Sequence, residues 1–469
     1  MYVTYEEILN RSETGPLMKE EDYDRRIGKV ARELTKKYQI KYTRDILVNY
    51  DDAMADRLFE AAIDFIVQCG VYVSDYNRVI EFTREEVLDT IAGVRTHVQY
   101  GRNKDAANVV KRTVESHKDP FIVFSPVGNP VDENVFQRFI MHYAQERITD
   151  AIFSPVLTTY HGRPVKSDVS SEMEASIWNL KTMREAARMV GRPDIGICNW
   201  ASTAEKTDVI IALADPTFGS IINDGVLFAA VAEMKVDQER LKKVSYCMQR
   251  GFILEALLGP LMGGYAGGPE GTAICLAAHY FLATLVYRTD ICCTFPIHIN
   301  HCTSNTPEVL WLTSLVNQGL ARNCNILKLT SFMSHAGPNT QMCMNEAAAY
   351  GLTATISGAD ALDLGAMTMN RHPMRWAVQE PKMAAEVGHI AARMGITRKD
   401  ANDIVKSLVA EYEPMLGSVA KGENRGSRWD ECYDIERLVP TDDYAQLVSN
   451  MKKKMGGFGL DWNILRTEL

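Results

Sequence analysis

The fold follows from one segment, Gly263-Gly264-Tyr265-Ala266-Gly267-Gly268-Pro269-Glu270-Gly271, and from the two apolar runs on either side of it. The run before it, Phe252–Met262, has the length of a buried strand, and the run after it, Thr272–Tyr287, has the length of a helix. Glycine has no Cβ and tolerates positive φ, so a glycine-rich turn lets the backbone approach a ligand or a partner closely. The segment therefore predicts a strand–turn–helix unit with a binding surface where the strand ends.

The same alternation of a short apolar run and a longer amphipathic run continues between residues 119 and 373. The strand candidates are Phe121–Phe124, Ala151–Phe153, Ile195–Cys198, Ser220–Asn223, Phe252–Leu258, Thr294–Ile299, Ile326–Leu329 and Ala361–Leu364. Strands that are continuously apolar are buried on both faces, as in a parallel sheet. Eight strand–helix units predict an α/β fold, the (β/α)8 TIM barrel. A doubly wound open sheet is the alternative, but no GxGxxG follows the first strand.

Helical patterns flank the predicted barrel at both ends. Lys19–Tyr38 is charged and amphipathic, and Thr83-Arg84-Glu85-Glu86 has the spacing of a capping box. Residues 1–118 are therefore predicted to form an N-terminal helical extension. Residues 374–469 are predicted to form a C-terminal helical segment packed on the barrel, which itself occupies 119–373.

The composition is that of a soluble globular protein, and it argues against several classes of partner. The net charge is −9 and no long basic run is present, so nucleic acid is not an expected partner. The longest apolar stretch, Ala273–Tyr287, is shorter than the ~20 residues that span a bilayer, so no membrane partner is expected. No signal peptide is visible, and the 10 cysteines have no repeating spacing, which is typical of reduced thiols in the cytoplasm.

Three polar residues near predicted strand ends are the candidate catalytic groups, because active residues of such barrels lie where strands end and loops begin. Glu255 lies inside an apolar strand, where a carboxylate has to be paired, protonated or turned toward a ligand. A buried structural salt bridge is the alternative for Glu255. Asp224 follows the predicted fourth strand, although Asn223-Asp224-Gly225 also fits a simple turn. His298 lies in the predicted sixth strand.

Aromatic and polar side chains at the same strand ends are candidates for substrate binding. Tyr160, Trp200 and Phe332 would form a box for a quaternary ammonium cation if they converge, and core packing is the alternative for each. The polar candidates are Asn199, Asn223, Asn300 and His301.

A bound metal is not expected, because the sequence has no CxxC and no HExxH. Tetrahedral zinc, ligated by nitrogen and sulfur, is the alternative. Its candidate ligands are Cys198, His301, Cys302 and His335.

Several segments share an order and a spacing with one known family. They are Gly70-Val-Tyr-Val-Ser-Asp, Gly101-Arg-Asn-Lys-Asp-Ala-Ala-Asn-Val-Val-Lys-Arg, Gly191-Arg-Pro, Gly263-Gly-Tyr-Ala-Gly-Gly, Pro296-Ile-His-Ile with Ser304-Asn-Thr, Ala336-Gly-Pro-Asn-Thr-Gln-Met-Cys and Glu431-Cys-Tyr-Asp. Over nearly the whole chain the sequence resembles the methylamine methyltransferases, specifically the monomethylamine:corrinoid methyltransferase family. The resemblance implies a (β/α)8 barrel that delivers a methyl group to Co(I) of a separate small corrinoid protein docked over the barrel mouth. It also implies a homo-oligomer with no permanently bound cofactor of its own.

The resemblance also marks where this sequence departs from the family. Members active on monomethylamine carry pyrrolysine at the end of strand three, and the matching residue here is Ala201. Two acidic residues near the amine are matched by Leu227 and Leu257, and a Gln and a Tyr of strand seven by Ser331 and Met333. Alanine forms no imine adduct, so the substrate has to arrive activated, as a quaternary ammonium does because its demethylation releases a neutral amine. The resemblance therefore predicts methyl transfer from a small methylated substrate other than monomethylamine, a quaternary amine or betaine.

On this hypothesis Asp224 or Glu255 would balance the charge of the substrate, and His298 would hydrogen-bond a polar group on it. The residues expected to face the corrinoid are Gly264, Tyr265 and Gly267. Two alternatives stay open. One is zinc-dependent methyl transfer from a methoxy or methylthio compound, in which the metal activates the leaving oxygen or sulfur. The other is a binding or sensing protein without catalysis.

Overall fold

Eight parallel strands form one sheet, rolled into a barrel, in the computed structural model, which describes residues 3–201, 206–231 and 233–465. The strands are β5 (Phe121–Phe124), β7 (Ala151–Phe153), β11 (Gly196–Asn199), β12 (Gly225–Ala229), β14 (Ile253–Leu258), β16 (Ile291–Thr294), β18 (Lys328–Ser334) and β19 (Ala361–Met367). Their order is β11-β7-β5-β19-β18-β16-β14-β12. The edge strands β11 and β12 come together, since the Ile197 N–H donates to the Asp224 carboxylate at 2.9 Å. The fold is the (β/α)8 TIM barrel that the sequence predicts.

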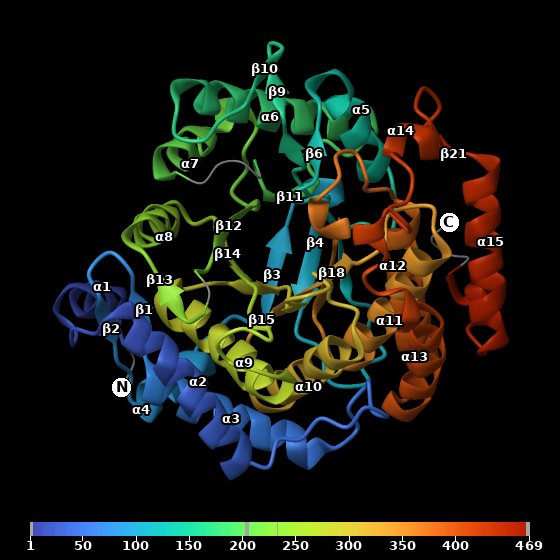
Figure 1. The fold of residues 1–469 in the computed structure, drawn as a ribbon. Coiled ribbons are helices and arrows are strands. Elements are labelled where there is room, and N and C mark those ends of the chain that lie inside the picture. Colours follow the sequence, from blue (N-terminus) through green and yellow to red (C-terminus); the bar gives the residue numbers. More distant parts are fainter. Residues whose placement is uncertain (1–2, 202–205, 232, 466–469) are drawn as a thin grey trace.

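A helix follows each strand, and Figure 1 shows these helices as a ring around the sheet. They are α5 (Glu133–Ala144), α6 (Ser170–Met189), α7 (Thr207–Leu213), α8 (Gln238–Arg250), α9 (Pro269–Val286), α10 (Pro307–Asn323), α11 (Gln341–Ile356) and α12 (Gln379–Met394). Nearly every residue of α9 and α11 is buried, because a second layer of helices covers them. On α9 this layer is α2 (Glu20–Lys37) and α3 (Asp52–Cys69), and on α11 it is α13 (Arg398–Tyr412). The terminal extensions therefore complete the core of the barrel.

Two predicted strands lie elsewhere along the chain. Residues 220–223, predicted as strand four, form a loop, and β12 begins after them at Gly225. The prediction of Thr294–Ile299 as strand six is also wrong, because β16 ends at Thr294 and Pro296, which has no N–H to donate, interrupts the run. The residues beyond it form a separate short strand, β17 (Ile297–His298), which pairs with β15 (Leu261–Met262).

The N-terminal extension is not purely helical. Its helices are α1 (Tyr5–Thr14), α2, α3 and α4 (Arg84–Ala92), and the capping box at Thr83 is confirmed. It also forms two strand pairs that the sequence patterns did not predict, β1 (Val71–Val73) with β2 (Arg78–Ile80) and β3 (His97–Tyr100) with β4 (Ala107–Val110). The β3–β4 hairpin packs Val98 and Tyr100 against residues of the barrel interior such as Phe121 and Ile253. The hairpin therefore closes the floor of the barrel, the end at which the strands begin.

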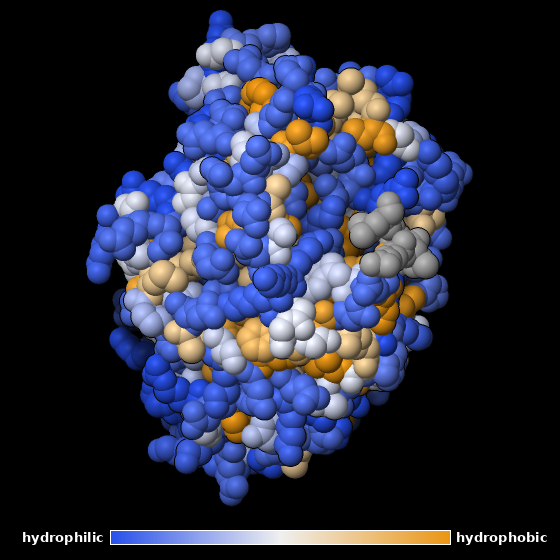
Figure 2. Space-filling model, turned by 90° about the vertical axis from the view of Figure 1, so that its right-hand side faces the viewer, coloured by the Kyte–Doolittle hydropathy of each residue, from blue (hydrophilic) through white to orange (hydrophobic). Residues whose placement is uncertain are grey.

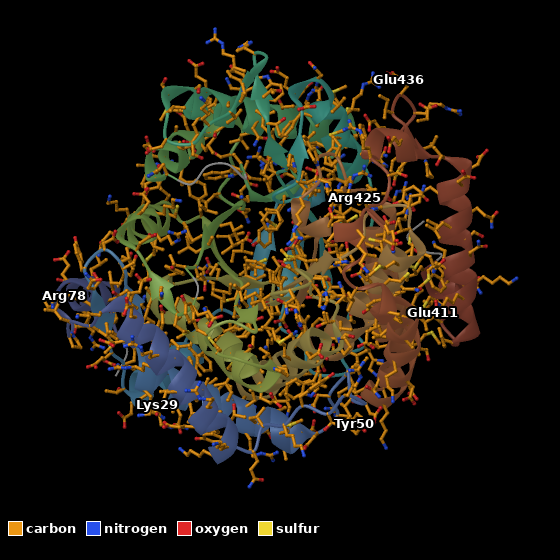
Figure 3. The ribbon with its side chains drawn as sticks, in the orientation of Figure 1. Lys29, Tyr50, Arg78, Glu411, Arg425 and Glu436 are labelled. Carbon is orange, nitrogen blue, oxygen red and sulfur yellow. The ribbon has the colours of Figure 1, made fainter. Side chains whose placement is uncertain are left out.

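The C-terminal segment packs beside the barrel through α13 and α15 (Asp442–Gly457), which both contact α11. Figure 2 shows that hydrophilic residues cover most of the face that carries α15, while apolar residues gather in small patches. Figure 3 shows Lys29 of the N-terminal extension and Glu411 of the C-terminal segment on the outside of the molecule. Within the ranges given above, no helix has the length and apolarity needed to cross a membrane.

Candidate active site

A cavity of about 410 Å³ opens at the mouth of the barrel, the end at which the strands finish. Its apolar wall comes from the ends of several strands and the loops that follow them. The residues of this wall are Val127, Ala201, Leu227, Ala229 and Leu257. Active sites of (β/α)8 barrels lie at this end, because the loops after the strands converge there. The cavity is therefore the candidate active site.

Strand register brings Ala201, Leu227 and Leu257 to this one cavity. The pairing of β11 is irregular between Ile197 and Asn199, and beyond this point the side chains of Asn199 and Ala201 reach the cavity. Ala229 of β12 pairs with Leu257 of β14. Leu227 lies two residues before Ala229 and therefore on the same face of β12. The three residues that the resemblance matches to pyrrolysine and to two acids thus share one wall, which offers no nucleophile and no carboxylate.

The rim of the cavity carries charges of both signs. They belong to Lys206, Asp237, Glu239, Arg240 and Lys243. The Asp237 carboxylate accepts the Arg240 N–H at 2.8 Å at the start of α8 and is also ion-paired with the Arg240 guanidinium. The Glu239 carboxylate accepts the Thr207 N–H at 2.7 Å, which joins α8 to α7. A mixed rim of this kind suits a zwitterionic ligand.

Asp363 is a buried carboxylate of the barrel interior that the sequence reasoning missed. It lies on β19 in register with Ser331 of β18, whose hydroxyl donates to it, and the Cys293 thiol lies 3.4 Å from its Oδ2. Burial raises the pKa of Asp363, although hydrogen bonds from neighbouring side chains oppose this. The signal was present in Ala361-Leu-Asp-Leu-Gly, an acid in an apolar strand, and it is the same signal that singled out Glu255.

Glu255 lies one inward position below the cavity, since Leu257 is the next residue on its face of β14. Its Oε1 accepts the hydroxyl of Tyr100 at 2.6 Å, and Tyr100 belongs to the hairpin that closes the floor. Burial raises the pKa of Glu255 and favours its neutral form. The buried salt bridge considered for this residue is not formed among the described residues, and a tyrosine hydroxyl takes the place of the cation.

Asp224 precedes β12 and lies at the floor, at the opposite end of the barrel from the cavity. Its carboxylate accepts the Arg184 guanidinium at 2.6 Å and the Trp200 indole N–H at 3.1 Å, in addition to the bond that joins β11 to β12. Asn223 donates to the main chain of the β3–β4 hairpin at 3.0 Å. Asp224 and Asn223 therefore hold the floor together, and Trp200 is the predicted site residue that Asp224 contacts.

The predicted aromatic box is not formed. Trp200 is buried outside the barrel wall, where its ring meets that of Phe252 edge-on with centroids 4.8 Å apart. Phe332 packs against a tyrosine of α11. Tyr160 lies in the pair of β9 (Thr159–Tyr160) and β10 (Arg163–Pro164) and packs toward α6. Neighbouring residues of a strand point to opposite faces, and both Trp200 and Phe332 fall on the outer face.

The predicted zinc ligands do not form a metal site. The His335 Nε2 accepts a backbone N–H of the C-terminal segment at 2.9 Å, and its Nδ1 contacts the His301 carbonyl at 2.9 Å, so both ring nitrogens are engaged. Cys198 belongs to the barrel interior, where burial raises the pKa of its thiol. Cys302 and His301 lie in the loop after β17, and the ring of His298, the last residue of β17, lies 4.7 Å from that of His301 between centroids. Across the described ranges no three His, Cys, Asp or Glu side chains are grouped so that they could hold a metal ion.

The glycine-rich loop after β15 wraps the buried carboxylate of Glu233, which accepts two backbone N–H groups of this region at 3.1 Å each. Gly263 and Gly267 have φ values of 94° and 83°, which a residue with a Cβ rarely adopts. Tyr265, between them, is 51% exposed, and the Lys235 ammonium lies 5.4 Å from its ring centroid. The loop therefore presents an exposed tyrosine on the mouth side of the barrel.

A (β/α)8 barrel with a cavity at the carboxyl ends of its strands defines the general class of the protein, a barrel enzyme. Comparison with known proteins defines the class further. The sequence matches the family described as "Monomethylamine methyltransferase MtmB" over residues 3–460. The chain belongs to this family and is a methyltransferase.

Individual relatives cover almost the whole chain. Monomethylamine methyltransferase MtmB2 of Methanosarcina barkeri and MtmB1 of Methanosarcina acetivorans are each 29% identical over 455 residues, with 97% of both chains covered. The crystal structure of the Methanosarcina barkeri enzyme superposes with a TM-score of 0.93 at 28% identity, covering 97% of this chain and 98% of that one. The same values hold for the crystal structure of the hydroxylamine MtmB complex.

Proposed function

We propose that the protein transfers a methyl group from a quaternary amine, of the betaine type, to Co(I) of a corrinoid carried by a separate small protein. The observation that carries the proposal is the apolar wall of Ala201, Leu227 and Leu257 in the mouth cavity. In the family that the sequence resembles, pyrrolysine and two acids occupy the matching positions and handle a simple amine. An apolar wall offers such an amine no nucleophile and no carboxylate, but it accommodates the methyl groups of a quaternary nitrogen.

The chemistry of the proposed donor makes the missing covalent group unnecessary. When the N–CH3 bond breaks, its electron pair stays on nitrogen and leaves a neutral tertiary amine. Co(I) supplies two electrons to the new C–Co bond and becomes Co(III), so atoms and electrons balance. The barrel then has to bind the donor, exclude water and direct one methyl group toward the mouth.

The rim and the mouth-side loops are the parts proposed to meet the rest of the substrate and the partner. A betaine carries a carboxylate, for which Lys206, Arg240 and Lys243 of the rim supply opposite charge. The partially exposed His298 and the exposed Asn300 follow β16 on the same side and are proposed to hydrogen-bond polar groups there. The corrinoid is proposed to approach over the glycine-rich loop, where the residues concerned are Gly264, Tyr265 and Gly267.

The test is an anaerobic assay with free cob(I)alamin as methyl acceptor and a panel of methylated donors. We expect at least one quaternary amine to be demethylated, with the tertiary amine detected by mass spectrometry, and monomethylamine to stay intact. Demethylation of monomethylamine alone would overturn the proposed substrate class. Binding of a donor without any turnover, with cob(I)alamin and with corrinoid proteins alike, would favour the non-catalytic alternative.

A further inference from the structure

Arg240 lies at the edge of the mouth cavity, in the first turn of α8, and lines the cavity together with Ala229. Its guanidinium is held from two sides. Nε–H donates to the Ala229 carbonyl at the end of β12, and Nη1 donates to the Asp237 carboxylate. The same carboxylate accepts the Arg240 backbone N–H at 2.8 Å. The guanidinium therefore has a defined position at the rim, because a strand end and a helix cap both hold it.

One end of this guanidinium is not used by the protein. Nη2 carries two N–H groups, and no residue of 3–201, 206–231 or 233–465 accepts them. Arg184 at the floor shows the contrast, because its Nε, Nη1 and Nη2 all donate to protein oxygens at 2.6 to 2.8 Å. A planar guanidinium with unused N–H groups matches a carboxylate, which accepts charge-assisted hydrogen bonds from it. Arg240 therefore differs from an arginine that only joins parts of the fold.

The guanidinium adjoins the apolar wall of the cavity. Ala229, whose carbonyl accepts the Nε–H, belongs to that wall and pairs with Leu257, which also belongs to it. The other carboxylate of the rim, Glu239, accepts the backbone N–H and the hydroxyl of Thr207, each at 2.7 Å, so it is already engaged by the protein. A ligand that meets both the wall and the guanidinium therefore carries methyl groups and an anion a few bonds apart, as a short betaine does.

We propose that Arg240 binds the carboxylate of the methyl donor and selects quaternary amines that carry a carboxylate close to the nitrogen over those that carry none. The inference rests on the proposed function and narrows its substrate class to one recognition residue. Of the other basic residues of the rim, Lys206 lies 3.8 Å from the Asp168 carboxylate, and Lys243 follows Arg240 one turn along α8. The carboxylate takes no part in methyl transfer, so its contact is the same in the bound substrate and in the transition state. Loss of the contact should therefore raise KM and leave kcat nearly unchanged.

The experiment compares the binding of trimethylglycine and of choline by calorimetry at constant ionic strength. Choline carries a hydroxymethyl group where trimethylglycine carries its carboxylate. We expect the wild type to bind trimethylglycine at least tenfold more tightly than choline, and Arg240→Gln to lose this preference because trimethylglycine alone binds more weakly. Arg240→Lys, which keeps the charge and loses the planar N–H groups, should weaken trimethylglycine at least threefold and leave choline unchanged. The matched control is Lys242→Gln, which removes one positive charge from an exposed position of the same helix and should leave both affinities unchanged.

Equal affinity of Arg240→Gln and the wild type for trimethylglycine would overturn this inference and leave the proposed function standing. An equal weakening of both ligands would also overturn it, because Arg240 would then shape the cavity instead of binding a carboxylate. If Arg240→Gln does not fold, Arg240→Lys decides, and unchanged affinity for trimethylglycine in that variant would overturn the inference. Failure of the wild type to bind either ligand, while it demethylates a donor that is not quaternary, would overturn the proposed substrate class together with the inference.

Discussion

The floor and the interior of the barrel hold their carboxylates in different ways. At the floor, an aspartate directly precedes four of the strands and accepts a backbone N–H near the start of the preceding strand, at 2.7 to 3.0 Å. These residues are Asp150, Asp224, Asp290 and Asp360. In the interior, Asp363 lies within its strand and accepts side-chain donors of neighbouring strands, the Ser331 hydroxyl and the Cys293 thiol. The difference teaches that an aspartate before a strand joins the backbones of two strands, whereas one inside a strand is held by side chains.

The largest expected effect is at the floor. Asp224→Ala should lower the free energy of unfolding by about 3–5 kcal/mol, because it removes a fully buried carboxylate that holds the partly buried Arg184 guanidinium, the Trp200 indole N–H and the Ile197 N–H. Urea unfolding measures the loss, with Asp403→Ala on the exposed face of α13 as the control expected to change stability by less than about 0.5 kcal/mol. A loss below about 1 kcal/mol would show that the floor does not depend on this aspartate.

The mouth should respond mainly in activity. Ala201→Phe places an aromatic ring at the cavity wall and should lower kcat/KM for the methyl donor by about a hundredfold, which corresponds to roughly 2.7 kcal/mol. Because Ala201 is 2% exposed, the larger ring should also lower the thermal midpoint by a few degrees, so activity is compared at a temperature at which both proteins are folded. Ala410→Phe on the exposed surface of α13 is the matched control. Full activity of Ala201→Phe would remove the cavity from the mechanism.

Tyr100→Phe tests the hydrogen bond between Tyr100 and Glu255, which lies between the floor and the mouth of the barrel. It leaves the Glu255 Oε1 without its donor and should lower the free energy of unfolding by about 1–3 kcal/mol. Because burial raises the pKa of Glu255 above its ordinary value of 4.5, the folded state keeps a proton that the unfolded chain loses. The contribution of Glu255 to stability therefore declines as pH rises through that value, and Tyr100→Phe should make the decline larger. Tyr76→Phe, which changes an exposed tyrosine, is the control, and equal pH profiles of the two variants would contradict the pairing.

The smallest expected effect is at the glycine-rich loop. Tyr265→Ala should change the free energy of unfolding by less than about 0.5 kcal/mol, because the ring is exposed. It should lower the rate of methyl transfer to the corrinoid protein several-fold and leave transfer to free cob(I)alamin unchanged. An equal loss with both acceptors would mean that Tyr265 acts on the donor and not on the partner.

The alternation of apolar runs and helical patterns was sufficient to predict the barrel, because burial on both faces leaves a clear signature in each strand. The bounds of β5 and β7 are confirmed to the residue. The direction of individual side chains was not predictable in the same way. Trp200 faces outward because the irregular pairing of β11 turns Asn199 and Ala201 inward, and no local pattern encodes such a shift.

The floor left a signal in the sequence that alternation alone did not reveal. An aspartate directly before an apolar run occurs in Thr149-Asp150, Asn223-Asp224, Thr289-Asp290 and Ala359-Asp360. This recurrence indicates that the four aspartates share one structural role, the joining of neighbouring strands. It would have assigned Asp224 to the floor. Asp363 breaks the pattern, because it lies inside its strand, where side chains of neighbouring strands are its hydrogen-bond donors.

The most direct test of the account is the rate at which the wild-type protein converts Co(I) to methyl-Co(III), followed by absorbance with a quaternary amine and with monomethylamine in parallel. The account predicts conversion with a quaternary amine that Ala201→Phe slows by about a hundredfold, and none with monomethylamine. Conversion with monomethylamine, at the same rate in the wild type and in Ala201→Phe, would contradict it.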